Sequence, residues 1–224
     1  MNYNNEFITT NRIDNIHNYN IDISNREIFL HSYINEEGEE NLDYRCAINL
    51  EKNLRILNHI SDKPILIHMH LCGGDWEDCM GMYDAIKFSK AKTIIVAYAK
   101  VSSSSSVLFQ AADTRIIMPN SSMLIHYGSI SFDGEHTKAA SSSIHWNNIE
   151  SEKMVNIFTE KCTNSQLAKD RNWKKMMARK HIVSQLDNKC DWILSADESV
   201  YYGFSDGVLG SKRFPTLEKL KYKK

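Results

Sequence analysis

Apolar residues recur along most of the chain in short runs that are separated by longer amphipathic stretches. Continuous runs of about four to eight apolar residues are typical of buried strands, and apolar residues about three or four positions apart are typical of helices. The runs predict strands over residues 26–30, 64–71, 93–99, 115–118 and 123–126. The helical spacing predicts helices over residues 43–60, 76–86, 107–112, 139–162, 165–190 and 196–202. Because strands and helices alternate, the pattern predicts an α/β fold with a largely parallel sheet.

The two ends of the chain and one internal stretch lack this pattern. Residues 1–25 include eight asparagines, which predicts a mobile or partner-contacting N-terminal segment. Residues 35–40 are mostly acidic and predict a loop. Residues 211–224 carry six basic residues against one acidic residue, which predicts a solvated basic C-terminal tail. No linker rich in proline, glycine or serine divides residues 26–210, so we expect one domain there.

Composition and charge exclude several classes of protein. The 224 residues carry 27 basic and 28 acidic side chains, and a net charge of -1 gives no electrostatic footprint for nucleic acid. No apolar run approaches the roughly 18 residues of a membrane-spanning helix, and the polar start lacks the apolar core of a secretory signal, so no membrane contact is expected. Five cysteines without a secretory context predict reduced thiols and a cytoplasmic location.

Candidate chemistry lies where predicted strands end. Gly73 and Gly74 follow one strand, and backbone N–H groups at such a junction can bind an oxyanion, although a tight turn alone also favours glycine. The serine run 102–106 follows the next strand, where a hydroxyl can act as a nucleophile, although serines also cap helices. His126 ends a later strand, and histidine is the most common base for a serine, although a lone histidine in a strand is often a core residue.

A metal site is an alternative hypothesis for the strand before the glycine pair. His68, His70 and Cys72 alternate along this strand and therefore point to one face. Three such ligands could hold zinc, but a structural zinc site needs a fourth ligand and no matching cluster stands out elsewhere. The sequence therefore favours a site with neither metal nor cofactor.

Several segments, taken in order, resemble the proteolytic subunit of the ATP-dependent Clp protease, a serine peptidase of the ClpP/crotonase fold. The matching segments are Arg-Glu-Ile-Phe-Leu at 26–30, Leu-Cys-Gly-Gly at 71–74, Met-Tyr-Asp-Ala-Ile at 82–86, Met-Pro-Asn-Ser at 118–121, Leu-Ile-His at 124–126 and Ile-Leu-Ser-Ala with its continuation at 193–206. The resemblance implies a ClpP/crotonase-like ββα superhelix with a protruding handle helix near residues 139–162. It also identifies residues 26–210 as a ClpP-like peptidase domain.

The resemblance further implies a Ser-His-Asp triad. Aligning the end of the family's nucleophile helix puts the nucleophile on Ser104, with Ser103 and Ser105 as alternatives in the serine run. The family's catalytic histidine falls on His126. Its aspartate stands eight residues before the Ser-Ala of the closing motif, which here reaches Asp187. In this scheme the histidine takes the serine proton and the aspartate orients the histidine.

The same resemblance implies an oxyanion hole, an assembly and partners. The backbone N–H groups of Gly73 and Ser105 would bind the oxyanion. The chain would form a homo-oligomer of stacked heptameric rings, a tetradecamer, and degrade unfolded polypeptides delivered by an AAA+ unfoldase ATPase. Cys72 stands where the family has proline, so the turn beside the glycine pair departs from the pattern.

Other functions remain open from the sequence. The chain could be a catalytically weak or inactive ring subunit with a structural or regulatory role, or a maturation protease that acts without an ATPase. An acyl-CoA enzyme of the crotonase type is disfavoured by the Ser, His and Asp set. A signal-peptide peptidase with a Ser-Lys pair is disfavoured because Lys100 is too close in sequence to the serines and no anchor segment is expected.

Overall fold

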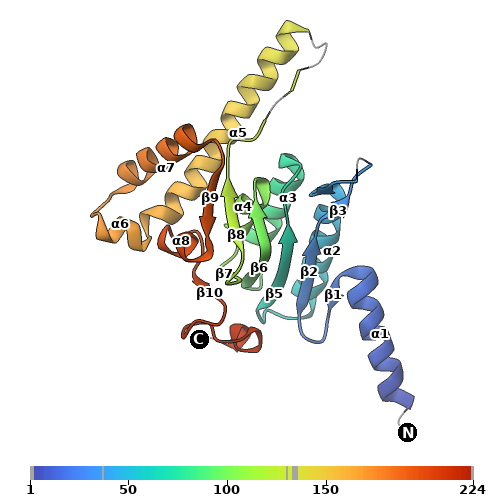
Figure 1. The fold of residues 1–224 in the computed structure, drawn as a ribbon. Helices are drawn as coiled ribbons and strands as arrows, with labels where there is room; N and C mark the ends of the chain where they lie inside the picture. The colour runs from blue at the N-terminus through green and yellow to red at the C-terminus, as the bar shows by residue number, and fades with distance from the viewer. Residues whose placement is uncertain (1–2, 37, 130, 133–135, 223–224) are drawn as a thin grey trace.

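The fold is built on one mixed sheet with most of its helices on one side. The computed structural model describes residues 3–36, 38–129, 131–132 and 136–222. Small parts of the expected N-terminal segment (1–2), acidic loop (37) and basic tail (223–224) therefore lie outside the described residues. Figure 1 shows the sheet at the centre, with α1 at one edge and the C-terminal helices at the other.

The main sheet follows the predicted α/β pattern and adds strands at its edges. Its main path has the order β1–β2–β5–β6–β7–β10, and β8 pairs with both β6 and β9. The pairs β2–β5, β5–β6, β6–β7, β6–β8 and β7–β10 are parallel, whereas β1–β2 and β8–β9 are antiparallel. The strands are β1 (Ile21–Asp22), β2 (Glu27–His31), β5 (Ile65–Leu71), β6 (Thr93–Ser102), β7 (Thr114–Ile117), β8 (Ser122–Ile125), β9 (Trp192–Ser195) and β10 (Gly207–Val208).

The long strand β6 divides its pairing between two neighbours. Residues 94–97 pair with β7, and residues 100–102 pair with β8. Ala99, between the two stretches, has a φ of 54°, so the strand bends where it changes partner. This arrangement brings the end of β6 beside the end of β8, where the serine run and His126 lie.

The helices bury their apolar stripes against the sheet and against one another. Helices α2, α3 and α4 cover one face of the sheet, and α7 packs on the inner half of α5 (Figure 1). The helices are α1 (Tyr3–Tyr19), α2 (Tyr44–Ile60), α3 (Trp76–Lys87), α4 (Ser104–Phe109), α5 (Thr137–Thr163), α6 (Gln166–Asp170), α7 (Lys175–Lys189) and α8 (Ala196–Tyr201). The predicted α/β class, with a protruding long helix, is confirmed.

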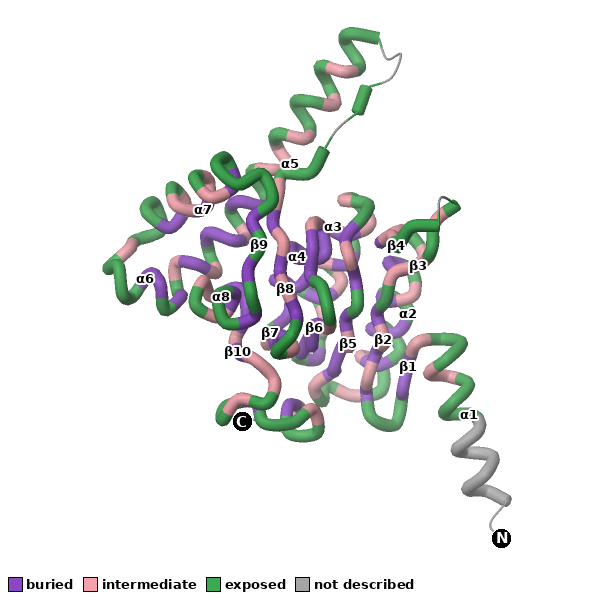
Figure 2. The backbone as a smooth tube through the Cα atoms, in the orientation of Figure 1, coloured by how far each residue is buried: buried purple, intermediate pink, exposed green. Residues whose placement is uncertain are grey.

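Helix α5 projects well beyond the body of the molecule. Its buried residues all lie in its second half, from Met154 to Cys162, whereas Ile144 and Trp146 in the first half are about half exposed. Figure 2 shows the outer turns of this helix as exposed or intermediate. A helix that leaves large apolar side chains in solvent has a surface suited to contact with another chain.

Several regions differ from the sequence prediction. Residues 165–190 form two helices, α6 and α7, because Asn172 takes a φ of 51° between them. The sequence pattern does not predict strand β9, since four residues at an antiparallel edge leave little periodicity to detect. The expected acidic loop is flanked by a small hairpin of β3 (Tyr33–Ile34) and β4 (Glu40–Asn41).

The C-terminal segment is held on the second face of the sheet by Phe214 and Leu220, so the expectation of a solvated tail fails at these two residues, while most of residues 211–219 are exposed. A 3₁₀ helix, η1 (Leu217–Tyr222), follows an irregular stretch, and Phe214 and Leu220 are buried. These two side chains close a second apolar cluster that also contains Leu66, Ile94, Val96 and Ile116. The charge of the segment does not reveal this packing, because the apolar residues that make it stand singly between polar and basic ones.

Ionic contacts fasten this C-terminal segment. The Lys221 ammonium donates to Glu27 Oε1 at 2.6 Å and to the Asn25 carbonyl at 2.6 Å. His68 bridges Glu27 Oε2 at 3.3 Å and the Tyr98 hydroxyl at 2.9 Å. The hydrogen bond with His68, followed by that with Lys221, holds the pKa of Glu27 at about 2, against the opposing effect of burial.

We expect the stabilising effect of Glu27 to depend on pH. Its folded pKa lies below its ordinary value of 4.5, so its contribution is fully present above about pH 4.5 and is lost as pH falls toward 2. The difference in unfolding free energy between wild type and Glu27→Gln, measured in urea between pH 7 and pH 3, should therefore shrink as pH falls. In a Lys221→Met background the same difference should be smaller at every pH, because Glu27 has lost one of its partners. A difference that grows toward low pH would contradict the stabilising role of ionised Glu27.

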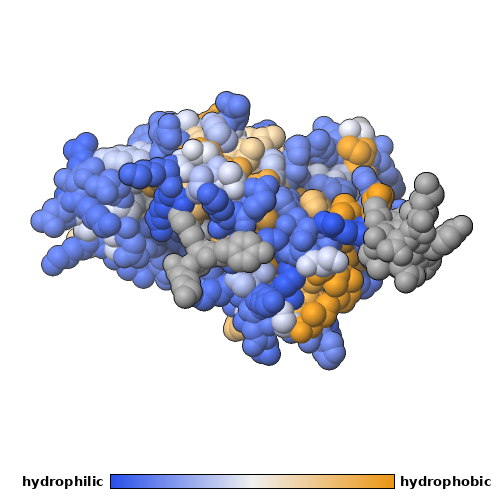
Figure 3. Space-filling model, turned by 90° about the horizontal axis from the view of Figure 1, so that it is seen from below, coloured by the Kyte–Doolittle hydropathy of each residue, from blue (hydrophilic) through white to orange (hydrophobic). Residues whose placement is uncertain are grey.

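The edge near α1 carries an apolar groove. It has a volume of about 580 Å³ and is lined by residues of α1, α2 and the β1 region, among them Tyr19, Ile23, Ile48 and Ile56. Figure 3 shows hydrophobic surface gathered on this side of the molecule. In the described part of the chain, no helix combines the length and apolar character that crossing a bilayer requires.

Candidate active site

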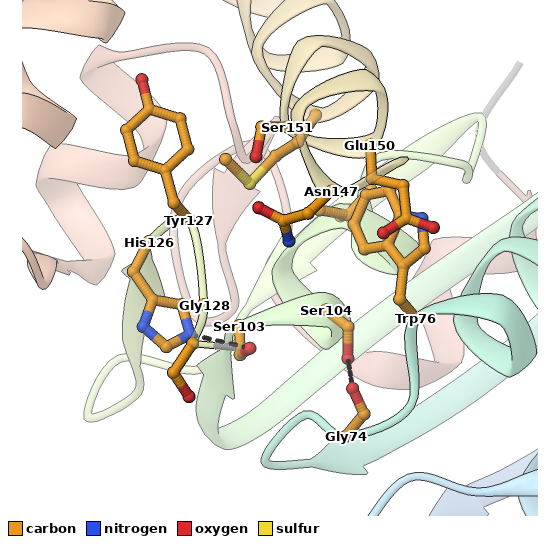
Figure 4. Close-up of a pocket in the computed structure, with 13 residues that line it drawn as sticks. Gly74, Trp76, Ser103, Ser104, His126, Tyr127, Gly128, Asn147, Glu150 and Ser151 are labelled. Carbon is orange, nitrogen blue, oxygen red and sulfur yellow. Dashed lines mark hydrogen bonds between the residues drawn. The ribbon is translucent and has the colours of Figure 1, made fainter. Parts of the chain in front are cut away.

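Ser103 occupies a strained turn between β6 and α4. Its φ of 57° and ψ of -133° are unfavourable for a residue with a side chain, and surrounding contacts must hold it there. Its N–H donates to the Leu124 carbonyl at 2.9 Å, and its carbonyl accepts from the Ser106 N–H at 2.9 Å and the Ser106 hydroxyl at 2.6 Å. This turn aims the Ser103 Oγ at His126 Nε2, 2.8 Å away (Figure 4).

The remaining serines of the run point into the protein. The Ser104 hydroxyl donates to the Gly74 carbonyl at 3.1 Å, and Ser104 is 5% exposed. Ser105 is fully buried, and its hydroxyl contacts the Leu71 and Ser102 carbonyls at 2.9 and 2.7 Å. The structure therefore brings Ser103, one of the two alternative positions, to His126, and it does not bring Ser104 there.

His126 links the serine to a carboxylate. It directly follows β8, and its Nδ1 lies 3.1 Å from Asp191 Oδ1. An ionised carboxylate only accepts hydrogen bonds, so Nδ1 carries the proton, and the Nε2 of a neutral imidazole is left to accept the Ser103 hydroxyl proton. The side chains of His126 and Asp191 are 29% and 60% exposed, so substrate can reach this chain of contacts.

Asp187, the aspartate expected from the sequence, makes a different contact. It lies in the last turn of α7, and Cys190 then turns the chain with a φ of 56° so that Asp191 reaches His126. Asp187 acts on Tyr127, whose pKa is raised first by burial and then by this carboxylate. Asp191 stands four residues before the Ser-Ala motif, whereas the resemblance places the aspartate eight residues before it. The spacing taken from the family therefore does not identify Asp191.

The glycine pair lies directly beside Ser103. Gly73 and Gly74 have φ values of 115° and 146°, and a Cβ on Gly73 would lie 2.8 Å from both the Ser102 carbonyl oxygen and the Ser103 Cβ. Among the described residues, the N–H groups of Gly73 and Ser104 donate no backbone hydrogen bond. Because Ser103 contacts His126, the N–H group that follows it is that of Ser104, one position before the expected Ser105.

We expect Gly73→Ala to lower stability and, in addition, to lower any hydrolysis per folded molecule at this site. The new Cβ would strain a left-handed backbone and displace the Ser103 turn, which would move the Gly73 N–H out of position. In the scheme that the sequence resemblance implies, losing one oxyanion donor costs about 2.7–4 kcal/mol of barrier, or roughly 10²–10³-fold in rate. Gly81→Ala is the matched control, since Gly81 lies within α3 and has its nearest neighbour, Glu51 Oε1, at 3.6 Å. Equal rates of hydrolysis in Gly73→Ala and Gly81→Ala would show that Gly73 has no role in the site.

A cavity of about 390 Å³ opens beside these groups. Figure 4 shows its walls, which come from the Gly74–Trp76 turn, the start of α4, the segment after β8 and one face of α5. The lining residues are Gly74, Trp76, Ser103, Ser104, Val107, His126, Tyr127, Gly128, Ser129, Asn147, Glu150, Ser151 and Met154. A hydroxyl held by a histidine at the edge of a cavity can attack a bound carbonyl group.

The alternative metal hypothesis finds no support in the described residues. His68 uses both ring nitrogens for contacts with Tyr98 and Glu27. Within the described ranges, no group of three or more His, Cys, Asp or Glu side chains could hold a metal ion. The five cysteines are free thiols, and burial raises the pKa of Cys79 to about 12.

Comparisons with known proteins show the family and the fold of this chain. The model of the Clp protease family matches residues 14–212. ATP-dependent Clp protease proteolytic subunit 2 of Pseudomonas aeruginosa is 29% identical over 180 residues, which cover 79% of this chain and 81% of that protein. The subunit 2 protein of Treponema denticola is 27% identical over 194 residues, 85% of each chain. A mutant ClpP1 from Listeria monocytogenes superposes with a TM-score of 0.66 at 22% identity, covering 85% of this chain and 95% of that one.

Proposed function

Because the chain belongs to the Clp protease family, we propose that it is a serine endopeptidase that hydrolyses peptide bonds of unfolded polypeptides. The observation that carries the proposal is the hydrogen-bonded chain from Ser103 through His126 to Asp191. Ser103 would be the nucleophile, His126 the general base and Asp191 the group that orients the imidazole. This assignment replaces Ser104 and Asp187 with the residues that contact His126.

In the proposed reaction, Ser103 Oγ attacks the carbonyl carbon while His126 Nε2 takes the hydroxyl proton. The N–H groups of Gly73 and Ser104 stabilise the resulting oxyanion. The C–N bond then breaks, and His126 donates its proton to the leaving amine. Water attacks the acyl ester with His126 again as the base, which releases a carboxylic acid and restores the Ser103 hydroxyl.

We also propose that the chain works as a subunit of an oligomeric chamber. The curated relatives are named as proteolytic subunits of an ATP-dependent protease, which supports an ATPase partner. The proposed assembly is the one that the sequence resemblance implies, stacked heptameric rings with an AAA+ unfoldase in the cytoplasm. Two apolar surfaces support contact with further copies. One is the outer half of α5, with Ile144 and Trp146 exposed, and the other is the groove between α1 and α2.

The direct test is reaction of the purified protein with a fluorophosphonate probe, followed by mapping of the modified peptide by mass spectrometry. We expect modification at Ser103, together with digestion of unfolded casein and sevenfold rings in negative-stain images. Rings without modification would instead support the alternative of a catalytically weak or inactive ring subunit. Modification at Ser104 would overturn the proposed assignment of the nucleophile.

A further inference from the structure

The cavity beside Ser103 carries an unbalanced negative charge. Among the described residues that line it, Glu150 is the only acidic side chain and none is a lysine or an arginine. Glu150 is only partly exposed, on the face of α5 that looks toward the glycine turn. A cavity with a carboxylate and no cation of its own attracts a positively charged ligand.

Two acidic groups at the start of α3 add to the negative charge of Glu150. Burial raises the pKa of Glu150, and the nearby carboxylates of Glu77 and Asp75 at the start of α3 raise it further, whereas Lys153 and a hydrogen bond from Trp146 lower it. The Lys153 ammonium stacks over the Trp146 ring, 5.3 Å from its centroid. A cation that entered the cavity would therefore reduce carboxylate repulsion across the gap between α3 and α5.

The cavity lies where the acyl side of a peptide would bind. His126 must protonate the leaving amine, so the leaving segment lies on the His126 side of Ser103. Figure 4 shows Trp76 and Glu150 on the opposite side of Ser103. The side chain that reaches them belongs to the residue whose carbonyl carbon is attacked.

The lining also suits the shape of a long basic side chain. Val107 and Met154 are buried and form an apolar wall, and the partly buried ring of Trp76 lines the same cavity as Glu150. An aliphatic stem can pack on such a wall, and its cationic head can contact the tryptophan face and the carboxylate together. The Asn147 amide offers a further oxygen acceptor to the same head.

We propose that Glu150 makes this cavity a subsite for a lysine or arginine side chain at the residue whose carbonyl is attacked. The proposal rests on the proposed peptidase function and adds to it a class of preferred substrate. Glu150 acts as a binding residue and takes no part in the proton transfers at Ser103.

The test compares two fluorogenic peptide amides that differ only in lysine or leucine before the scissile bond. In the wild type, kcat/KM should be higher for lysine, and Glu150→Gln should lower the lysine-to-leucine ratio roughly ten- to hundredfold, the usual range for losing a hydrogen bond to a charged group. Glu150→Lys should reverse the preference toward a glutamate peptide. Glu152→Gln is the matched control, because Glu152 lies on the same helix, faces Arg179 at 2.7 Å and does not line the cavity.

The outcomes separate the two proposals. Fluorophosphonate modification of Ser103 with an unchanged lysine-to-leucine ratio in Glu150→Gln would overturn the subsite and leave the peptidase function intact. A wild type that cleaves leucine faster than lysine would overturn the subsite in the same way. Absence of both modification and cleavage would overturn the peptidase function, and the subsite with it. Lysine and leucine phosphonate esters provide a second readout, since their rates of Ser103 modification should show the same change in ratio.

Discussion

Ser103→Ala should reduce peptide hydrolysis by a factor on the order of 10⁶, which is the usual consequence of removing a serine nucleophile. The reason lies in the contact of its Oγ with His126 Nε2, which no other serine of the run makes. The variant should fold normally, since this hydroxyl is on the cavity side of the turn. The measurement is the rate of cleavage of a fluorogenic peptide, with fluorophosphonate modification as an independent readout.

Ser104→Ala is the variant that separates the two assignments. Its hydroxyl contacts the Gly74 carbonyl and not the histidine, so its loss should cost about 1 kcal/mol of stability while cleavage and modification remain measurable. If Ser104→Ala abolished both and Ser103→Ala retained both, the register predicted from the sequence would be right and the one supported by the geometry wrong. Thermal unfolding of both variants shows whether a lost activity is a lost fold.

Asp191→Asn should lower kcat by up to about 10⁴-fold, because an amide no longer fixes the tautomer that leaves His126 Nε2 free to accept a proton. Asp187→Asn is the matched comparison, since the two aspartates are four positions apart at the end of α7. Asp187→Asn should change the surroundings of Tyr127 and leave most of the peptidase activity. The two kcat values, measured with the same peptide across a pH series, decide between the aspartates.

The opposite result for the two aspartate variants would indicate a conformational change near the end of α7. If Asp187→Asn were inactive and Asp191→Asn active, Asp187 would have to reach His126 in the working enzyme, and the end of α7 would move on assembly or substrate binding. The exposed side chain of Asp191 and the turn at Cys190 are the places where such a change would be accommodated.

The repeated strands and helices of the domain could be predicted from the sequence because their signal is long. The helix predicted over 43–60 is α2 (Tyr44–Ile60), and the strand predicted over 64–71 is β5 (Ile65–Leu71). In both, burial of apolar side chains determines the structure, and burial follows periodicity. The motifs also predict that the glycine pair and His126 follow strands, and the structure has them after β5 and β8, the two strands that pair with the end of β6.

The choice within the serine run could not be made in this way. Residues 102–106 are chemically identical, so no side-chain preference marks the one that faces solvent. The serine that faces His126 is the one directly after the last residue of β6. That serine is Ser103, whose strained φ ends the strand and is not favoured by the propensity of any serine. The aspartate is a similar case, because Asp187 and Asp191 differ by one helical turn and the bend at Cys190 decides which of them reaches the histidine.

The C-terminal cover over the second apolar cluster has a consequence for synthesis on the ribosome. Leu66, Ile94, Val96 and Ile116 emerge early, but Phe214 and Leu220, which shield them, emerge roughly a hundred residues after Ile116. Lys221 closes a loop back to Glu27 that spans almost the whole fold. A nascent chain that has reached the middle of the sheet therefore carries an open apolar face, and its self-association should depend on how soon residues 214–220 are made.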